Sequence, residues 1–245
     1  MLSVYGSVKG SPGATTFALA MAARWRTGGA APLVVELDPS GGDVGTRWQC
    51  HDVPGLAGMV LAARQGPLDA DGGFAQRLAI GVDVVVAPPS DAAAAAIDEF
   101  TASGRGPAVL RELAAARPVF VDVGRLDPRS AAQSYLDKAD ELLLVARPEL
   151  EQLRHLRARI QGLAERCPLV RLVLVGSGPY PAEEIAAYLG VPVAVAVPVD
   201  RSGAAIVNGR GRPQWGWTRR PLLIAARTLA LTYPTENLAG TGVNP

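Results

Sequence analysis

The stretch VKGSPGATTFALAMAARW, residues 8–25, joins a short apolar segment to a run of helix-forming residues through a glycine-containing loop. Gly10 and Gly13 allow the backbone to curl so that its N–H groups point inward. The helix that follows adds the positive end of its dipole, which favours an anion at this place. The stretch therefore predicts a phosphate-binding loop that opens into a helix over residues 15–25.

The positive charge in this loop is placed unusually. A common phosphate-binding loop carries a lysine directly before its Ser or Thr hydroxyl, whereas this chain has Ala14 before Thr15. Only two of the 24 basic residues are lysines, and one of them, Lys9, falls inside the glycine loop. Because a compact ammonium fits against phosphate oxygens, Lys9 is the candidate cation of the loop.

Short apolar runs recur along the chain with helical patterns between them. They are rich in Val and Leu and apolar on both faces, which is typical of strands buried in a parallel sheet. The expected strands cover residues 2–6, 32–38, 82–89, 118–124, 141–148, 169–176 and 191–198. The expected helices cover residues 15–25, 106–116, 150–166, 182–189 and 219–232.

This alternation predicts an α/β fold with a single doubly wound, mostly parallel sheet of about seven strands flanked by helices. Residues 1–233 are expected to form this one domain, because no internal stretch resembles a linker. Residues 234–245 are polar and glycine-rich and are expected to be a disordered tail.

Composition narrows the class of protein. The 24 basic and 23 acidic side chains nearly balance, which gives no global reason to expect nucleic acid or an anionic membrane as the main partner. Cys50 and Cys167 are far apart and lack metal-ligand spacing, so they are expected to be free thiols. No signal peptide or membrane span is recognisable, which predicts a soluble, cytoplasmic protein.

Acidic residues follow two of the expected strands. The segment ELDPSGGDVG places Glu36, Asp38 and Asp43 after the second strand, and VFVDVG brings Asp122 and Gly124 to the end of the fourth. Ligands of open α/β sheets bind at the carboxyl edge, where these groups should meet the glycine loop. An apolar strand that ends in Asp followed by Gly is typical of a site that holds magnesium and senses a γ-phosphate.

Together these motifs resemble the ParA/MinD family of deviant Walker P-loop ATPases, including its TadZ and CpaE kind, over residues 2–231. KGSPGATT is similar to the family's KGGxGKTT loop, ELDPSGGDVG to its first switch and FVDVG to its second. The resemblance implies ATP and Mg²⁺ as ligands and a homodimer whose nucleotide state acts as a switch. It also implies a protein partner in a larger assembly, such as a pilus, a secretion apparatus or a partitioning system.

The resemblance also implies roles for individual residues. Lys9 matches the signature lysine that reaches the partner subunit's nucleotide, and Asp43 matches the acid that orients the attacking water, so both are candidate catalytic residues. Thr15, Asp38 and the Walker B acid Asp122 are the implied magnesium site. The implied nucleotide-binding residues are Gly10, Ser11, Gly13, Ala14, Thr15 and Thr16, with Pro198 and Asp200 in the late loop that borders the adenine.

Three departures from the family pattern bear on activity. Ala14 removes the lysine that binds the β- and γ-phosphates, Ser11 replaces a glycine, and no adenine-reading asparagine is evident near Ser177. A charge-assisted phosphate contact is worth about 1.5–3 kcal/mol, so its loss weakens binding about tenfold to a hundredfold. Arg125 or Lys9 is a candidate substitute, although a solvated loop arginine is the simpler interpretation of Arg125. The expected enzyme is at most a weak ATPase.

Alternatives remain open at this stage. One is a pseudo-ATPase scaffold that binds no nucleotide and acts through its surfaces. Another is a dinucleotide site, since Glu36 or Asp38 lies about twenty residues after the glycine turn, but the spacing is not G-x-G-x-x-G.

Residues 201–227 hold six arginines and no acid, with Trp215 and Trp217 among them. This segment predicts a protein interface or a cap on the core rather than a DNA surface. The tail after residue 233 cannot form a basic amphipathic helix, so no direct membrane insertion is expected.

Overall fold

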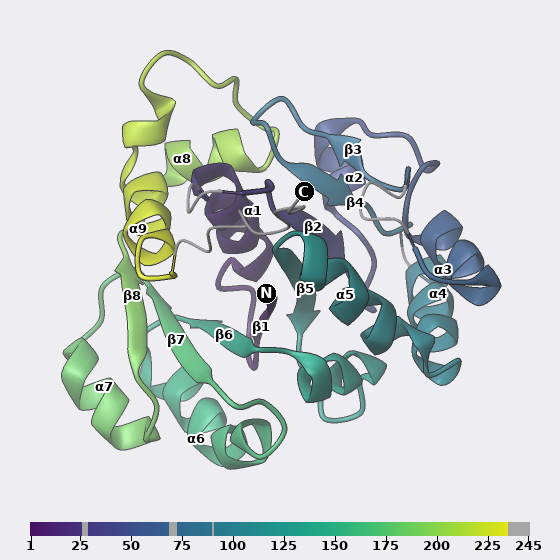
Figure 1. Cartoon of the computed structure of the whole chain (residues 1–245). Helices are drawn as coiled ribbons and strands as arrows, with labels where there is room; N and C mark the ends of the chain where they lie inside the picture. Colours follow the sequence, from purple (N-terminus) through teal and green to yellow (C-terminus); the bar gives the residue numbers. More distant parts are fainter. Residues whose placement is uncertain (26–28, 69–72, 90, 235–245) are drawn as a thin grey trace, which may run out of the picture.

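The computed structural model describes residues 1–25, 29–68, 73–89 and 91–234, and all but the first residue of the expected tail lies outside them (Figure 1). Within the described residues one sheet has the order β3-β4-β2-β5-β1-β6-β7-β8. Its edge strand β3 runs antiparallel to β4, and every other neighbouring pair is parallel. The strands are β1 (Leu2–Ser7), β2 (Leu33–Glu36), β3 (Gln76–Arg77), β4 (Asp83–Val85), β5 (Val119–Arg125), β6 (Glu141–Ala146), β7 (Val170–Val175) and β8 (Val193–Val197).

Helices connect these strands and cover both faces of the sheet (Figure 1). The α-helices are α1 (Ala14–Arg24), α2 (Val44–Trp48), α3 (Leu56–Gln65), α4 (Asp91–Ala102), α5 (Arg105–Ala116), α6 (Leu150–Ala164), α7 (Ala182–Leu189), α8 (Arg201–Val207) and α9 (Pro221–Ala230). Two 3₁₀ segments, η1 (Ala131–Lys138) and η2 (Trp217–Arg219), complete the described part.

Alternation along the strands divides the core into two layers. On β5, Val119, Val121 and Val123 pack with α3 to α7 on one face, while Phe120 packs with α1 and α9 on the other. Successive side chains of a strand point to opposite faces, so a strand buried on both sides must be apolar throughout. The Val- and Leu-rich runs of the sequence satisfy this condition, and the buried sheet was predicted from them.

The carboxyl ends of three adjacent strands bring the motifs together. β5 lies between β2 and β1, and Asp122 of β5 is in register with Glu36 of β2 and Tyr5 of β1. The loops that follow these strands therefore leave the sheet at one edge, beside the start of α1 at Ala14. This is the edge at which ligands of parallel sheets bind.

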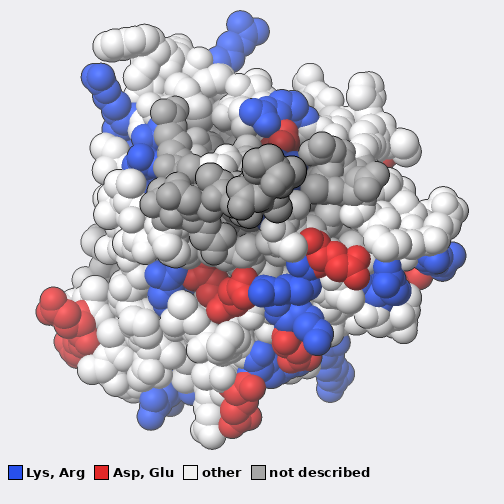
Figure 2. All heavy atoms as spheres, in the orientation of Figure 1, with Lys and Arg blue, Asp and Glu red and all other residues white. Residues whose placement is uncertain are grey.

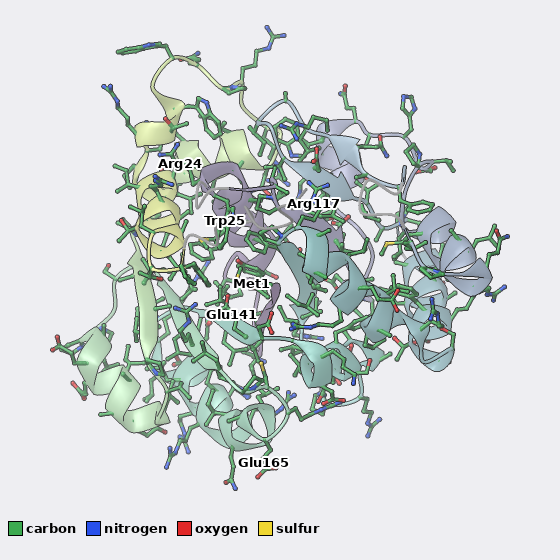
Figure 3. The ribbon with its side chains drawn as sticks, in the orientation of Figure 1. Met1, Arg24, Trp25, Arg117, Glu141 and Glu165 are labelled. Carbon is green, nitrogen blue, oxygen red and sulfur yellow. The ribbon has the colours of Figure 1, made fainter. Side chains whose placement is uncertain are left out.

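A buried polar cluster ties the end of the domain to its first strand. The Glu141 carboxylate, 2% exposed, accepts hydrogen bonds from the Ser3 hydroxyl (2.6 Å) and the Tyr233 hydroxyl (2.5 Å) and pairs with Arg171. Trp25 packs against Tyr233 with ring centroids 4.9 Å apart and the rings tilted by 55°, and Figure 3 labels Trp25, Met1 and Glu141. A buried charge is tolerated when it is paired in this way, so the packed domain extends at least to Tyr233.

The structure differs from the sequence expectation in its short elements. All seven expected strands are present, and β3 is added as an eighth, a two-residue polar strand that carries no apolar signal. Helices α2 and α8 are five and seven residues long, too short for a helical period to be recognised. Helices α3 and α4 were also not predicted; in α4 most apolar residues are alanines, so its apolar face is weak. Among the described residues no helix is long and apolar enough to cross a membrane.

Candidate functional site

A cavity of about 510 Å³ opens at the carboxyl edge of the sheet, directly above the β1–α1 loop. It brings together the glycine loop, both loops expected to act as switches, and the segment after α8. The lining residues are Ser7, Gly10–Thr16, Asp38, Ser40, Asp43, Arg47, Gly124, Arg125, Asn208 and Arg210. The sequence-predicted residues from Gly10 to Thr16 thus all line one cavity, together with Asp38 and Asp43.

Ala14 is the first residue of α1, with Gly13 as the N-cap. It contributes to the cavity wall and is also 7% exposed within the core layer of α1 and α9. A methyl group at this position carries no charge toward the cavity. The backbone N–H groups at the start of α1 and the helix dipole remain available to an anion.

Asp122 is the buried acid beneath this cavity. Its side chain is 1% exposed, and its Oδ1 accepts a hydrogen bond from the Gly124 amide at 3.1 Å. Among the described residues, its Oδ2 has no hydrogen-bond partner. Burial raises the pKa of Asp122 to about 7, and the negative charges of Glu36 and Asp38 add to this, while the Thr15 hydroxyl and the Gly124 amide oppose it.

This unsatisfied oxygen fits a cation site. Mg²⁺ binds oxygen ligands and keeps several waters, so one hydroxyl and one or two carboxylates suffice when phosphates supply the rest. Thr15, Asp38 and Asp122 provide that donor set. Among the described residues no three His, Cys, Asp or Glu side chains are close enough to hold a metal ion by themselves.

Asp38 connects the two switch loops. The Ser40 amide donates to its Oδ1 at 2.8 Å, and a Cβ on Gly124 would lie 1.8 Å from its Oδ2. Gly124 has φ +56° and no side chain, so the Asp38 carboxylate can rest directly on the backbone at the end of β5. Burial raises the pKa of Asp38 and so does Asp43, whereas Arg125 lowers it.

Glu36 holds the first switch loop in place. Its side chain is 2% exposed, its Oε1 accepts from the amides of Asp43 (2.8 Å) and Val44 (2.9 Å), and its Oε2 accepts from the Ala87 amide (3.1 Å). Burial raises the pKa of Glu36 despite these three bonds. Because the carboxylate is buried and engaged by three backbone amides, it is not available to bind a ribose, which argues against the dinucleotide alternative.

Asp43 lies at the start of α2 and faces solvent. Its carboxylate, 67% exposed, forms an ion pair with Arg47 one turn later. Arg47 also donates to the Asn208 Oδ1 at 3.1 Å. The side-chain NH₂ of Asn208 donates to the Thr16 hydroxyl at 2.9 Å. A chain of polar contacts therefore joins the first switch to the phosphate loop through a residue late in the sequence.

A second, more apolar cavity of about 170 Å³ lies beside the first and shares Pro12, Gly13 and Thr16 with it. Its other lining residues are Phe17, Val175, Val197, Pro198, Val199, Asp200, Arg201, Ala204 and Leu222. Pro198 thus lines a pocket of the kind that suits a flat, apolar ring next to the phosphate cavity.

Asp200 also lines this pocket, but its carboxylate, 2% exposed, is occupied by its own protein. It accepts from the amides of Gly203 (2.8 Å) and Leu222 (3.2 Å) and pairs with Arg220 at 3.0 Å. Burial acts to raise the pKa of Asp200, but these donors outweigh it and the net shift is downward. The geometry gives Asp200 the role of capping α8 and holding the start of α9.

No family model matches the sequence, and no curated protein matches it either. Solved structures do match in fold. A ParA family ATPase from Chlorobium tepidum TLS aligns with a TM-score of 0.74 and 18% identity over 95% of this chain and 99% of that one. The septum site-determining protein MinD from Pyrococcus horikoshii OT3, complexed with Mg-ADP, aligns with a TM-score of 0.70 and 18% identity over 98% and 96%.

The MinC:MinD cell division protein complex from Aquifex aeolicus also matches, with a TM-score of 0.62 and 16% identity over 94% of each chain. The chain has the fold of the ParA and MinD ATPases. The fold that the sequence predicted is therefore confirmed. At these identities the similarity concerns the architecture, and the site must be judged from this chain's own residues.

Within this ParA/MinD fold, Lys9 does not join the cavity of its own subunit. It is exposed in the loop after β1, and the cavity lining begins again at Gly10. The role expected for Lys9 toward a partner subunit stays a prediction, as does the role expected for Asp43 toward an attacking water.

Several cavity residues were not predicted as site residues. Ser7, Pro12 and Ser40 lie within or beside the predicted motifs, whereas Arg47, Asn208 and Arg210 come from α2 and from the turn after α8. Asn208 reaches the phosphate cavity from the end of α8 and does not line the apolar pocket at Pro198. The available signal was the Asn208-Gly209 pair, which often ends a helix.

Some side chains of segment 201–227 pack against the core, and others are exposed to solvent. Trp217 packs against the core layer of α1 and α9, whereas Trp215 is 92% exposed with Arg219 stacked over its ring at 5.4 Å. Arg220 is engaged by Asp200. The face shown in Figure 2 carries Lys and Arg without adjacent Asp or Glu at its upper left, over the α8–α9 region, and mixed charges below. Trp217 therefore covers part of the core, whereas Trp215 is exposed to solvent.

Proposed function

We propose that this chain is a ParA/MinD-like positioning or assembly protein that binds ATP with Mg²⁺ and hydrolyses it weakly or not at all. The observation that carries this proposal is the Oδ2 of Asp122, which has no partner among the described residues and is buried beside Thr15 under a cavity walled by the phosphate loop. A buried carboxylate oxygen without a donor is costly unless a ligand satisfies it. A hydrated magnesium ion carried by a nucleotide meets that need.

In this proposal the residues divide the work of binding. The backbone N–H groups of the Gly10–Thr16 loop, other than that of Pro12, hold the phosphates. Thr15, Asp38 and Asp122 hold the magnesium ion, and the apolar pocket at Pro198 takes the base. Bound Mg²⁺ would neutralise charge on the phosphates. Asp43 would orient a water, and its ion pair with Arg47 keeps its carboxylate near the cavity.

Weak turnover follows from Ala14. Phosphoryl transfer depends on positive groups that stabilise the charge of the transition state, and such contacts strengthen as charge develops. With Ala14 as its first residue, α1 provides the phosphates with its backbone N–H groups and dipole but with no charged side chain at that position. Nucleotide state would then act mainly by binding and release, through the contact between Asp38 and the loop at Gly124.

The proposed assembly is a homodimer that recruits a protein partner in the cytoplasm. Exposed Lys9 beside the cavity supports the dimer, since it is free to reach a second subunit. Exposed Trp215 with Arg219 supports a protein partner, because Trp and Arg are the side chains that most often anchor interfaces. A pilus, a secretion apparatus or a partitioning complex is the proposed kind of assembly.

A second candidate function is a scaffold that has lost nucleotide. The observation in its favour is again Ala14, whose methyl group is packed into the core where the family expectation is a charged side chain. The two functions differ in one measurable respect, the binding of ATP by the natural chain.

Titration calorimetry with ATP and Mg²⁺ tests the choice, with light scattering to follow the oligomeric state. The proposal expects wild-type binding, tighter binding by Ala14→Lys, and loss of ATP-dependent dimerisation in Lys9→Ala. Lys138→Ala is the matched control, because Lys138 is the other lysine, is exposed and does not line the cavity. Binding by Ala14→Lys but not by wild type at millimolar ATP would establish the scaffold instead.

A further inference from the structure

The cavity contains an excess of positive charge despite Ala14. Arg47, Arg125 and Arg210 all line it, against the two carboxylates of Asp38 and Asp43. One of the three guanidinium groups, that of Arg47, is already engaged by hydrogen bonds. Arg47 contacts Asp43 and Asn208. Arg125 forms no ion pair among the described residues, but its charge acts on Asp38 and lowers the pKa of that carboxyl. Within the described part of the chain, the exposed Arg210 side chain has no hydrogen-bond acceptor and no ion-pair partner.

The backbone that carries Arg210 is held firmly. The Arg210 amide donates to the Ala205 carbonyl at 2.8 Å, and the Gly209 amide donates to the Ile206 carbonyl at 3.1 Å, which closes the end of α8. Gly209 has φ +71°, and a Cβ there would lie 2.6 Å from the Arg47 carbonyl oxygen. Only glycine permits the loop to approach α2 this closely.

Side chains on either side fix the same turn to the phosphate loop. The Trp48 indole N–H donates to the Val207 carbonyl at 3.2 Å, and Arg47 donates to Asn208 at 3.1 Å. The side-chain NH₂ of Asn208 donates to the Thr16 hydroxyl in the first turn of α1 at 2.9 Å. The turn after α8 is thus clamped between α2 and α1, with Arg210 two residues beyond the clamp and on the cavity.

We infer that Arg210 supplies to the bound phosphates the positive charge that Ala14 cannot. This inference rests on the proposed nucleotide binding and adds to it a specific phosphate-binding residue. Three observations carry it: the side chain lines the phosphate cavity, it has no competing acceptor among the described residues, and its backbone is anchored to the phosphate loop. A guanidinium matches phosphate oxygens with two parallel donors, and it is less strongly hydrated than an ammonium.

The placement has a physical consequence. A lysine at the start of α1 would approach the phosphates from the helix N-terminus, whereas Arg210 approaches from the α8 turn that also contacts α2. Binding of phosphates would therefore draw α8, α2 and α1 together through one side chain. The charge would come from a residue far along the chain from Ala14.

Calorimetry with ATP and Mg²⁺ on the full chain tests the inference. Arg210→Ala is expected to raise the Kd for ATP by about tenfold to a hundredfold, which corresponds to the loss of one charge-assisted contact. Arg210→Lys is expected to retain most of the affinity, and Ala14→Lys combined with Arg210→Ala to restore it. Arg212→Ala is the control, because Arg212 is also exposed two residues later and does not line the cavity.

The outcomes separate this inference from the function on which it rests. ATP binding by wild type with an unchanged Kd in Arg210→Ala overturns the inference alone. An equal loss in Arg212→Ala also overturns it, since the effect would then be general surface charge. Absence of wild-type binding refutes the proposed function and this inference together. Urea unfolding of Arg210→Ala is expected to match wild type, because the substituted side chain is exposed.

Discussion

Replacing Asp122 by asparagine removes a buried charge while keeping the shape of the side chain. In wild type the folded protein raises the pKa of Asp122 from 3.8 to about 7. At a pH between these two pKa values, Asp122 is protonated in the folded protein and ionised in the unfolded chain. The contribution of Asp122 to stability is therefore greatest below pH 3.8 and declines as the pH rises toward 7, above which it is constant.

The size of the effect follows from the shift. Each pH unit between the two pKa values changes the free energy of unfolding by about 1.4 kcal/mol. From pH 5 to pH 8 wild type is expected to lose about 3 kcal/mol through Asp122. The asparagine side chain has no proton to lose, and its Oδ1 can still accept from the Gly124 amide. We expect Asp122→Asn to be more stable than wild type at pH 8 and to show a flatter pH profile.

Urea unfolding of metal-free protein in EDTA, at pH 5 and pH 8, measures this difference. With a slope of about 3 kcal/mol per molar urea for a chain of this size, a change of about 3 kcal/mol moves the midpoint by about 1 M. Glu36 and Asp38 also have raised pKa values, so the variant retains a smaller slope of the same sign. Equal pH profiles for the two proteins, or a less stable Asp122→Asn at pH 8, would contradict the reasoning.

Two further substitutions test the switch loops. Gly124→Ala places a Cβ against the Asp38 carboxylate at φ +56° and is expected to destabilise the protein by about 1–3 kcal/mol, measured by urea unfolding. The control Gly162→Ala, in α6 where a Cβ meets nothing within 4 Å, is expected to stabilise it by about 0.5–1 kcal/mol. Glu36→Gln turns one acceptor into a donor facing a backbone amide and is expected to cost about 1–3 kcal/mol. Hydrogen exchange of residues 37–48 should quicken in that variant, and unchanged protection would show that Glu36 does not anchor the loop.

The sequence was sufficient where structure is local or strictly periodic. The bounds of α7 were predicted without error, because Pro181 precedes its first turn and Gly190 follows its last, at φ +74°. The convergence of the glycine loop with Asp38, Asp43 and Asp122 could also be predicted, because parallel strands end at one edge. These inferences need only the direction of each strand and the identity of the residue that follows it.

The sequence was insufficient where a contact spans the chain. The Asn208–Thr16 hydrogen bond joins residues 192 positions apart, and the Arg47–Asn208 bond joins residues 161 apart. No local pattern states which helix end will meet which loop. Asp200 illustrates the same difficulty, because its identity and position in the late loop matched the expectation while its oxygens are used by α8 and α9.

Two residues bear on the choice between a nucleotide-dependent switch and a scaffold without nucleotide: the buried acid Asp122, and Ala14 in place of the expected lysine. An ionised Asp122 costs the folded protein about 3 kcal/mol at pH 8 relative to pH 5, and its Oδ2 receives no compensating hydrogen bond among the described residues. A scaffold without nucleotide would be more stable with asparagine there. A protein that binds a magnesium nucleotide recovers the loss when the ligand satisfies the carboxylate. Ala14 removes a charge that Arg210 is proposed to replace, whereas the Asp122 carboxylate is buried and couples to Thr15. The proposed binding of a magnesium nucleotide therefore gives the buried Asp122 carboxylate a role, which a scaffold without nucleotide does not.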